Sequence, residues 1–148
     1  MLLLCSLLLL LFLLSLMEQQ LINAALDGKV EEVEALLRDN PGLDVNWLDS
    51  NSRTPLHCAA DGGHFEIAKL LLAHPMINVN IQSLLTRQTP ACLCCENGSV
   101  EVVQLFLKDP RTTFADNDGG CSPLWWASYW GHCEVVEWLI ASGRELGT

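Results

Sequence analysis

The chain has 148 residues, of which 50% are apolar, and 18 acidic against 8 basic residues give it a formal net charge of −10. This length allows one domain with a sizeable core and a short appendage. Because the basic residues are scattered along the chain, the sequence lacks the clustered phosphate contacts of a nucleic-acid-binding protein. We therefore expect no nucleic-acid partner.

Residues 1–17 form a leucine-rich leader with no charged side chain before Glu18. The leader has the length of the apolar core of a signal peptide, but no basic residues precede that core. It is short for a transmembrane helix, which needs about 20 apolar residues, and would be a marginal anchor. Alternatively, translation starts at Met17 and the leader has no function. A membrane contact is expected only through residues 2–16.

After the leader, residues 53–80 show most clearly a unit of helix, tight turn, helix and extended segment. Thr54 is an N-cap and Pro55 fits the first helical position, where its missing N–H costs nothing. The glycines at 62–63 end this helix because glycine adopts the left-handed backbone readily. An apolar stripe at helical spacing predicts a second helix at about residues 65–73.

The same order of features occurs four times. The turn glycines are Gly28, Gly63, Gly98 and Gly131, at separations of 35, 35 and 33 residues. The helix-start pairs Thr54-Pro55, Thr89-Pro90 and Ser122-Pro123 share one register. Periods of this length are typical of a stacked solenoid. We expect repeats at about residues 18–48, 49–83, 84–116 and 117–148, so that the repeat domain covers residues 18–148.

The pattern Thr-Pro-Leu-His-x-Ala-Ala-x-x-Gly-His-x-Glu-Ile at residues 54–67 resembles the ankyrin repeat. The resemblance covers about residues 18–148 and is clearest at residues 54–72 and 131–140. It implies an all-α solenoid of four helix-turn-helix repeats with hairpin loops, preceded here by a short apolar N-terminal helix. It also implies protein–protein interaction, as a scaffold or adaptor, and no enzymatic activity. The third repeat departs from the family pattern, since Arg87 occupies the fingertip glycine position and one extra residue precedes Thr89.

In this family, positions that packing leaves free line a concave face and the hairpin fingertips, where partners bind. The resemblance therefore implies a partner site on both surfaces. On the concave face its residues are Leu26, Asp27, Cys58, Asp61, Leu93, Glu96, Asn97, Trp126, Tyr129 and Trp130. At the fingertips they are Asn51, Arg53, Thr86, Gln88 and Asp118. The three aromatic residues of the last repeat either form a binding hot spot or cover the end of the stack. Trp138 aligns with Leu70 and Leu105 and is expected in the core.

Cysteine and histidine positions favour structural roles. Cys94 and Cys95 align with the small pair Ala59 and Ala60, so they are expected to be buried as small hydrophobes. Buried thiols of this kind suit a reducing cytoplasm. His57 is expected to cap its helix, and the histidines that follow the turn glycines are expected to bond loop carbonyls. No histidine stands beside a nucleophile with an orienting acid, and phosphate-loop and paired-cysteine motifs are missing. We therefore expect no enzyme, no metal site and no cofactor.

The last helix keeps the full apolar pattern as far as Ile140, although a terminal repeat should present a polar outer face. Either the sequence is part of a longer array, or this end associates with another copy of the chain. The expected partner is otherwise an unidentified protein. The expected location is cytoplasmic, with membrane attachment or the secretory pathway as the alternative if the leader functions.

Overall fold

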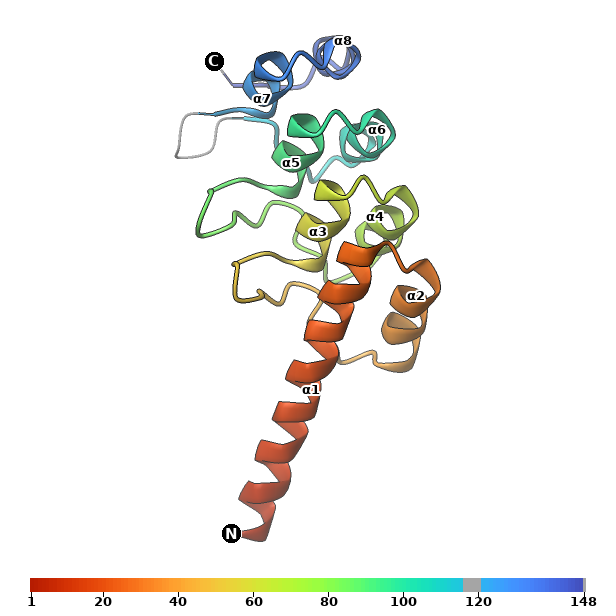
Figure 1. Ribbon diagram of the computed structural model, residues 1–148, viewed down its shortest axis with the longest axis vertical. Coiled ribbons are helices and arrows are strands. Elements are labelled where there is room, and N and C mark those ends of the chain that lie inside the picture. The colour runs from red at the N-terminus through yellow and green to blue at the C-terminus, as the bar shows by residue number, and fades with distance from the viewer. Residues whose placement is uncertain (116–120, 148) are drawn as a thin grey trace.

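The computed structural model describes residues 1–115 and 121–147, which form helices and no strands. In chain order the helices are α1 (Leu2–Asp27), α2 (Val30–Asp39), α3 (Pro55–Asp61), α4 (Phe65–Leu72), α5 (Pro90–Glu96), α6 (Val100–Lys108), α7 (Pro123–Tyr129) and α8 (Cys133–Ala141). The odd-numbered helices stack in an inner column and the even-numbered helices in an outer one (Figure 1). The loops before α3 and α5 project sideways from the inner column as fingers. The predicted all-helical solenoid is confirmed.

Each inner helix after the first begins as the sequence predicts. The side-chain oxygens of Thr54, Thr89 and Ser122 accept hydrogen bonds from the backbone N–H three residues later, at 3.2–3.3 Å. In α3 the ring of His57 completes the cap, because its Nδ1 accepts from Thr54 N at 3.1 Å. Its Nε2 donates to the carbonyl of Gln88 at 3.1 Å, so one buried imidazole ties its helix to the next finger.

Two of the turn glycines, Gly28 and Gly98, are required both by backbone conformation and by space. Gly28 and Gly98 have φ of 73° and 72°, in the left-handed region that disfavours side chains. A Cβ added at Gly28 would lie 2.7 Å from the ring of His64, and one at Gly98 would lie 2.5 Å from the ring of His132. Each of these histidines donates from Nε2 to a carbonyl of the preceding repeat, at 3.1 and 2.7 Å. The histidines bond carbonyls as predicted, but the acceptors lie in the last turns of α1 and α5 and not in loops, so the bonds join neighbouring repeats.

Small side chains line the contact between neighbouring inner helices. Ala59, Ala60, Cys94 and Cys95 are all fully buried, as predicted from their alignment. Ala24, Ala25 and Ala127 occupy the same register in the first and last repeats and are buried as well. The outer helices add larger apolar side chains to this core, among them Ile67, Leu71, Phe106 and Leu139. Short side chains in the inner column let the helices approach closely, and the branched and aromatic ones fill the space beside them.

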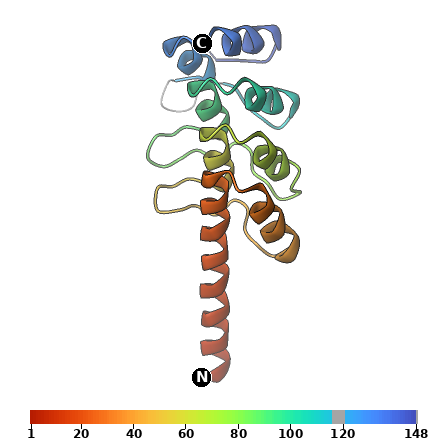
Figure 2. The same cartoon turned by 45° about the vertical axis from the view of Figure 1, so that its right-hand side comes forward.

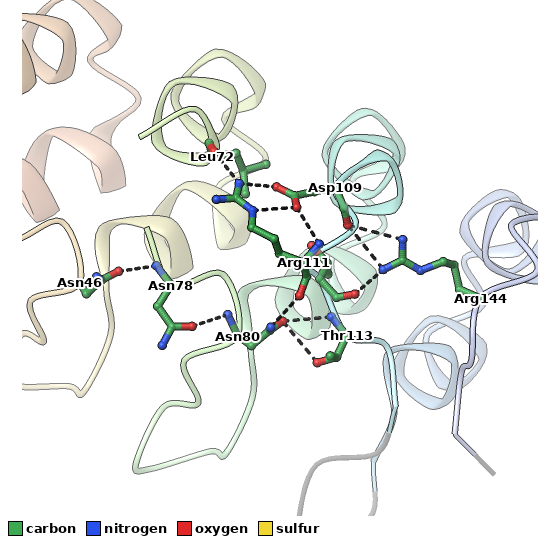
Figure 3. A network of polar contacts seen from close by, with 9 residues as sticks. Asn46, Leu72, Asn78, Asn80, Asp109, Arg111, Thr113 and Arg144 are labelled. Atoms are coloured by element: carbon green, nitrogen blue, oxygen red, sulfur yellow. Dashed lines mark hydrogen bonds and ion pairs between the residues drawn. The ribbon is translucent and has the colours of Figure 1, made fainter. Parts of the chain in front are cut away.

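The extended segments between repeats carry polar ties that the sequence analysis did not predict (Figure 3). Asn46 donates to the carbonyl of Met76 and accepts from Asn78 N, both at 2.8 Å. Asn80, in the equivalent position, bonds residues of the following repeat in the same way. Arg111 donates from Nη2 to the carbonyl of Leu72 at 2.7 Å. This carbonyl ends an outer helix, where no intrahelical donor is available.

The apolar leader continues without a break into the inner helix of the first repeat. Residues 1–13 are exposed, and the first fully buried side chain is that of Leu21. The carboxylate of Glu18 accepts from Asp44 N at 3.2 Å, where the helix meets the folded repeat. Beyond that point α1 extends away from the stack in both views (Figures 1 and 2). In the described part of the chain, α1 is the one helix long and apolar enough to cross a membrane by length and composition.

Two tryptophans of the last repeat are exposed. Trp138 was expected in the core, but 44% of its surface is exposed, and this prediction is wrong. The aligned Leu70 and Leu105 are themselves only half-buried, so this register lies at the edge of the core, and the larger indole of Trp138 is exposed beside Gln104 and Lys108 of α6. Trp125 is also 44% exposed, although it takes the position of the fully buried His57.

His57 should make the stability of the fold depend on pH. Burial lowers the pKa of this imidazole from 6.5 to about 4, so the folded protein keeps the ring neutral where the unfolded chain takes up a proton. The resulting contribution is present above pH 6.5 and is lost as the pH falls toward 4. We expect it to reduce the free energy of unfolding by about 2 kcal/mol between pH 7 and pH 5.

Urea denaturation of the wild type and of His57→Gln at both pH values measures this effect, because glutamine does not titrate. The variant should be less stable at pH 7 and should lose less stability on acidification. An equal loss in both proteins would show that His57 does not carry the pH dependence.

Candidate interaction groove

A groove of about 310 Å³ lies between the second and third repeats, and we call it the interaction groove. Fingers 49–53 and 83–88 form its sides, and α3 and α5 form its base. Its lining residues are Asn51, Arg53, His57, Asp61, Ser83, Leu85, Thr86, Gln88 and Leu93. The structure therefore brings together six of the residues predicted to bind a partner, namely Asn51, Arg53, Asp61, Thr86, Gln88 and Leu93.

Arg53 is held in place at one side of the interaction groove by two carboxylates. Its guanidinium lies 3.6 Å from Asp49 and 3.8 Å from Asp61, and its side chain is 25% exposed. Asp49 also accepts from the backbone N–H groups of Asn51 and Arg53, at 2.8 and 2.9 Å, which folds the finger around its carboxylate. The arginine is thus a fixed part of the wall.

The concave-face polar groups beside the groove are tied to one another across the repeats. The amide of Asn97 donates to the carboxylate and to the carbonyl of Asp61, at 2.8 and 3.0 Å. The amide of Gln88 donates to the carboxylate of Glu96. These carboxylates already have hydrogen-bond partners inside the protein. The exposed side chain of Leu85 and the half-buried side chain of Leu93 therefore provide apolar groove surface that a partner can contact.

The two fingers differ by the extra residue noted in the sequence. In the first, Asp49 N bonds the carbonyl of Arg53 at 3.0 Å, and in the second, Ser83 N bonds that of Gln88 at 2.9 Å. The second loop therefore closes over one more residue. Ser52 and Arg87 lie in the left-handed region, with φ of 59° and 56°. The fingertip keeps its glycine-like backbone even though neither residue is a glycine.

Some of the other predicted partner residues lie on the accessible concave face and some do not. Leu26, Asp27, Asn97, Tyr129 and Trp130 are exposed, and Glu96 and Trp126 are half-buried. The placement of Cys58 on this face is wrong, because its short side chain is fully buried in the core. Gln88 is only 5% exposed, so it contributes to the base of the groove and not to a fingertip. Asp118 lies outside the described residues.

The side chains of Trp125, Trp126, Tyr129 and Trp130 form an aromatic cluster on α7 and the residue after it. Trp125 and Tyr129 stack with ring centroids 5.0 Å apart and planes 10° apart. Trp126 and Trp130 meet this stacked pair edge-on, at 4.9 and 5.3 Å. Tyr129 is 65% exposed and Trp130 is 56% exposed. This arrangement presents rigid aromatic surface at the end of the array.

Four of the seven thiols, those of Cys58, Cys92, Cys94 and Cys95, are buried core side chains. All seven cysteines are free. Burial raises the pKa of Cys58 to about 11 and also raises those of Cys92 and Cys94, so these thiols stay protonated at neutral pH. Within the described residues, no group of three His, Cys, Asp or Glu side chains could hold a metal ion.

Comparison with known proteins agrees with the geometry of the stack. The family description "Ankyrin repeats (3 copies)" matches residues 9–83 and 76–148. The chain belongs to the ankyrin repeat family. Membership of this family accounts together for the turn glycines, the Thr-Pro and Ser-Pro pairs that begin the inner helices, and the projecting fingers.

Several curated proteins are similar to most of this chain. Transient receptor potential cation channel subfamily A member 1 from Homo sapiens is 31% identical over 120 residues, which are 81% of this chain and 10% of the channel. Probable E3 ubiquitin-protein ligase XBOS32 from Oryza sativa subsp. japonica is 35% identical over 124 residues, 83% of this chain and 25% of the ligase. Ankyrin repeat domain-containing protein 63 from Homo sapiens is 30% identical over 113 residues, 68% of this chain and 30% of that protein. The chain thus spans less than a third of each.

The left-handed backbone at Ser52 predicts a simple stability effect. Replacing Ser52 by glycine should relieve the strain of a side chain at φ 59°, and should raise the free energy of unfolding by up to about 1 kcal/mol. Asn51→Gly is the matched control, because Asn51 has no positive φ and glycine there only loosens the unfolded chain. Urea denaturation should show stabilisation by the first change and destabilisation by the second. The reverse order would contradict the assigned finger conformation.

Proposed function

We propose that this ankyrin repeat protein is a scaffold or adaptor that binds a partner protein through the interaction groove and the adjoining concave face. The observation that supports this function best is the groove itself, where two fingers and two inner helices surround uncommitted apolar surface. The Arg53 ion pairs and the Asp49 turn already fix one wall of the groove, so partner binding loses little conformational entropy there. The proposed activity is binding without catalysis.

The groove indicates the kind of segment that it accepts. Leu85 and Leu93 offer apolar contact, and Asn51 and Thr86 offer polar groups at the fingertips. A partner segment with one apolar side chain flanked by hydrogen-bonding groups would satisfy both. Such a segment could continue along the exposed Asn97 toward the aromatic cluster, whose tyrosine and tryptophans are of the types that dominate interface energetics.

We propose that the repeat domain works in the cytoplasm. Cys58, Cys92, Cys94 and Cys95 are free and buried in the core, as a reducing compartment allows. The alternative location, attached to a membrane by α1, is compatible with the same repeat domain on the cytoplasmic side.

A second candidate function is self-association through the outer face of the last repeat. Three large apolar side chains are exposed there, namely those of Trp125 (44%), Trp138 (44%) and Ile140 (63%). Cys92, which occupies the position of Trp125 in the third repeat, is only 2% exposed. Trp138 also lines a hollow of about 290 Å³ with Gln104, Leu107, Lys108, Ala141 and Ser142. A two-fold dimer would place the same apolar surface of each copy against the other.

The groove can be tested with two neighbouring leucines of one finger. Leu85 lines the groove and Leu84 does not, but their exposures are similar, at 71% and 75%. We expect Leu85→Ala to weaken partner binding about tenfold, the usual effect of truncating an apolar anchor. Leu84→Ala should have little effect. Quantitative affinity purification from cell extract, with all three proteins at equal concentration, would measure the recovery of each partner. The groove is the wrong site if partners are retained by Leu85→Ala or lost equally from both variants.

Self-association can be tested by sedimentation velocity over a range of concentrations in a detergent that covers the leader. The wild type should form a dimer as concentration rises, because pairing removes two indoles and an isoleucine from water. Trp138→Gln with Ile140→Gln should shift the equilibrium to monomer. Met76→Gln, at a 73% exposed position outside this face, is the control and should still dimerise. A wild type that remains monomeric at the highest concentration would rule out this association.

A further inference from the structure

The leader part of α1 is apolar on every side. Residues 7–13 are consecutive apolar residues, and their exposures lie between 44% and 63%. Successive residues of a helix point about 100° apart, so seven in a row cover the whole circumference. A helix that binds a protein groove or a second helix needs only one apolar stripe. A helix that is apolar on every side is surrounded completely by apolar groups, in a protein core or in a bilayer, and no described part of this chain covers residues 1–13.

The polar atoms of this segment are also suited to such a medium. No charged side chain lies between Leu2 and Met17. The hydroxyl of Ser6 donates to the carbonyl of Leu2 at 2.9 Å, so it is satisfied inside the helix without water. Backbone N–H groups are paired inside the helix from Cys5 onward, which is the condition for entering hydrocarbon, and the unpaired N–H groups of the first turn lie at the very end of the segment.

We propose that residues 2–16 of α1 insert into the hydrocarbon region of a lipid bilayer. At 1.5 Å per residue this segment is about 22 Å long, which is shorter than a hydrocarbon core of about 30 Å, so the bilayer has to thin locally around it. Glu18, Gln19 and Gln20 follow at the level of the headgroups. The same point is where Glu18 accepts from Asp44 N, so the polar boundary of the helix coincides with its contact to the first repeat.

The continuous helix then sets the orientation of the repeat domain. Both views show α1 leaving one end of the stack while α7 and α8 lie at the other end (Figures 1 and 2). The bilayer therefore lies beside the first repeat, and the aromatic cluster and α8 are the parts farthest from it. The fingers project sideways from the inner column, so the interaction groove stays open to water.

The driving force is the burial of apolar surface and not charge. With a net charge of −10, the protein gains nothing from anionic headgroups. Insertion should therefore occur into vesicles of neutral phosphatidylcholine and should persist at high salt.

Two native cysteines provide the test, using the full chain and phosphatidylcholine vesicles. Cys5 on the leader and Cys133 on α8 are both exposed. A charged, water-soluble maleimide should label both in dilute buffer, as located by mass spectrometry. After addition of vesicles, the labelling of Cys5 should fall at least tenfold and that of Cys133 should not change. Loss of Cys133 labelling would overturn the orientation, and unchanged Cys5 labelling would overturn the insertion.

Vesicle flotation with variants gives an independent measurement. Leu8→Asp with Leu9→Asp should lower the partition of the protein into vesicles at least tenfold, because each change puts a carboxylate into hydrocarbon. Leu84→Asp with Leu85→Asp, an equally exposed pair on a finger, should float like the wild type. Equal partition of both variants would overturn the proposal. So would protection of Cys5 before vesicles are added, because other copies of the chain would then cover the leader.

Discussion

The fold depends on the close contact between neighbouring inner helices, which the small pairs at positions 24–25, 59–60 and 94–95 allow. These side chains are fully or almost fully buried, and nothing larger would let the backbones approach so closely. One helix pair alone cannot bury its apolar faces, so each repeat is stable only against its neighbours. The same contact sets the distance between successive fingers and hence the size of the interaction groove. Replacing alanine by cysteine preserves it because a buried thiol packs as a small hydrophobe.

Features fixed by local backbone chemistry could be predicted from the sequence. The Thr54 cap, the left-handed Gly28 and the buried Cys94 each follow from one residue type at one position of a periodic pattern. The features that were missed depend on what a neighbouring repeat provides. Arg111 bonds the end of the preceding outer helix, 39 residues away in the sequence, and Thr113 bonds Asn80, 33 residues away. Contacts at such separations leave no local pattern in the sequence. Trp138 aligns with Leu70 and Leu105, which are half-buried at the edge of the core, and its larger ring is 44% exposed.

The sequence predicted which residues lie near the candidate site better than it predicted which of their side chains are exposed. Six of its residues line one groove, but side-chain size decided which of the aligned positions reach the surface. Cys58, Leu93 and Trp126 share a register, and only the smallest is completely buried. The groove also lies where the repeat pattern is irregular, beside the finger that closes over one more residue. The extra residue lies in finger 83–88, which also carries the exposed Leu85. This difference from the usual repeat therefore helps to form the surface that a partner would contact.

The two ends of the array both expose apolar side chains, but these lie all round the helix at the leader end and on only part of the surface at the last repeat. The two ends therefore suit different kinds of neighbour. On the leader, apolar side chains cover the whole circumference of a single helix, which the hydrocarbon of a bilayer can surround completely. On the last repeat they occupy one face of a helix pair, beside Gln104, Lys108 and Ser142, and a folded surface with a matching apolar face can cover them. The interaction groove lies between these ends and opens to the side. Lipid at one end and protein at the other would therefore leave it accessible, because neither contact competes for the same residues.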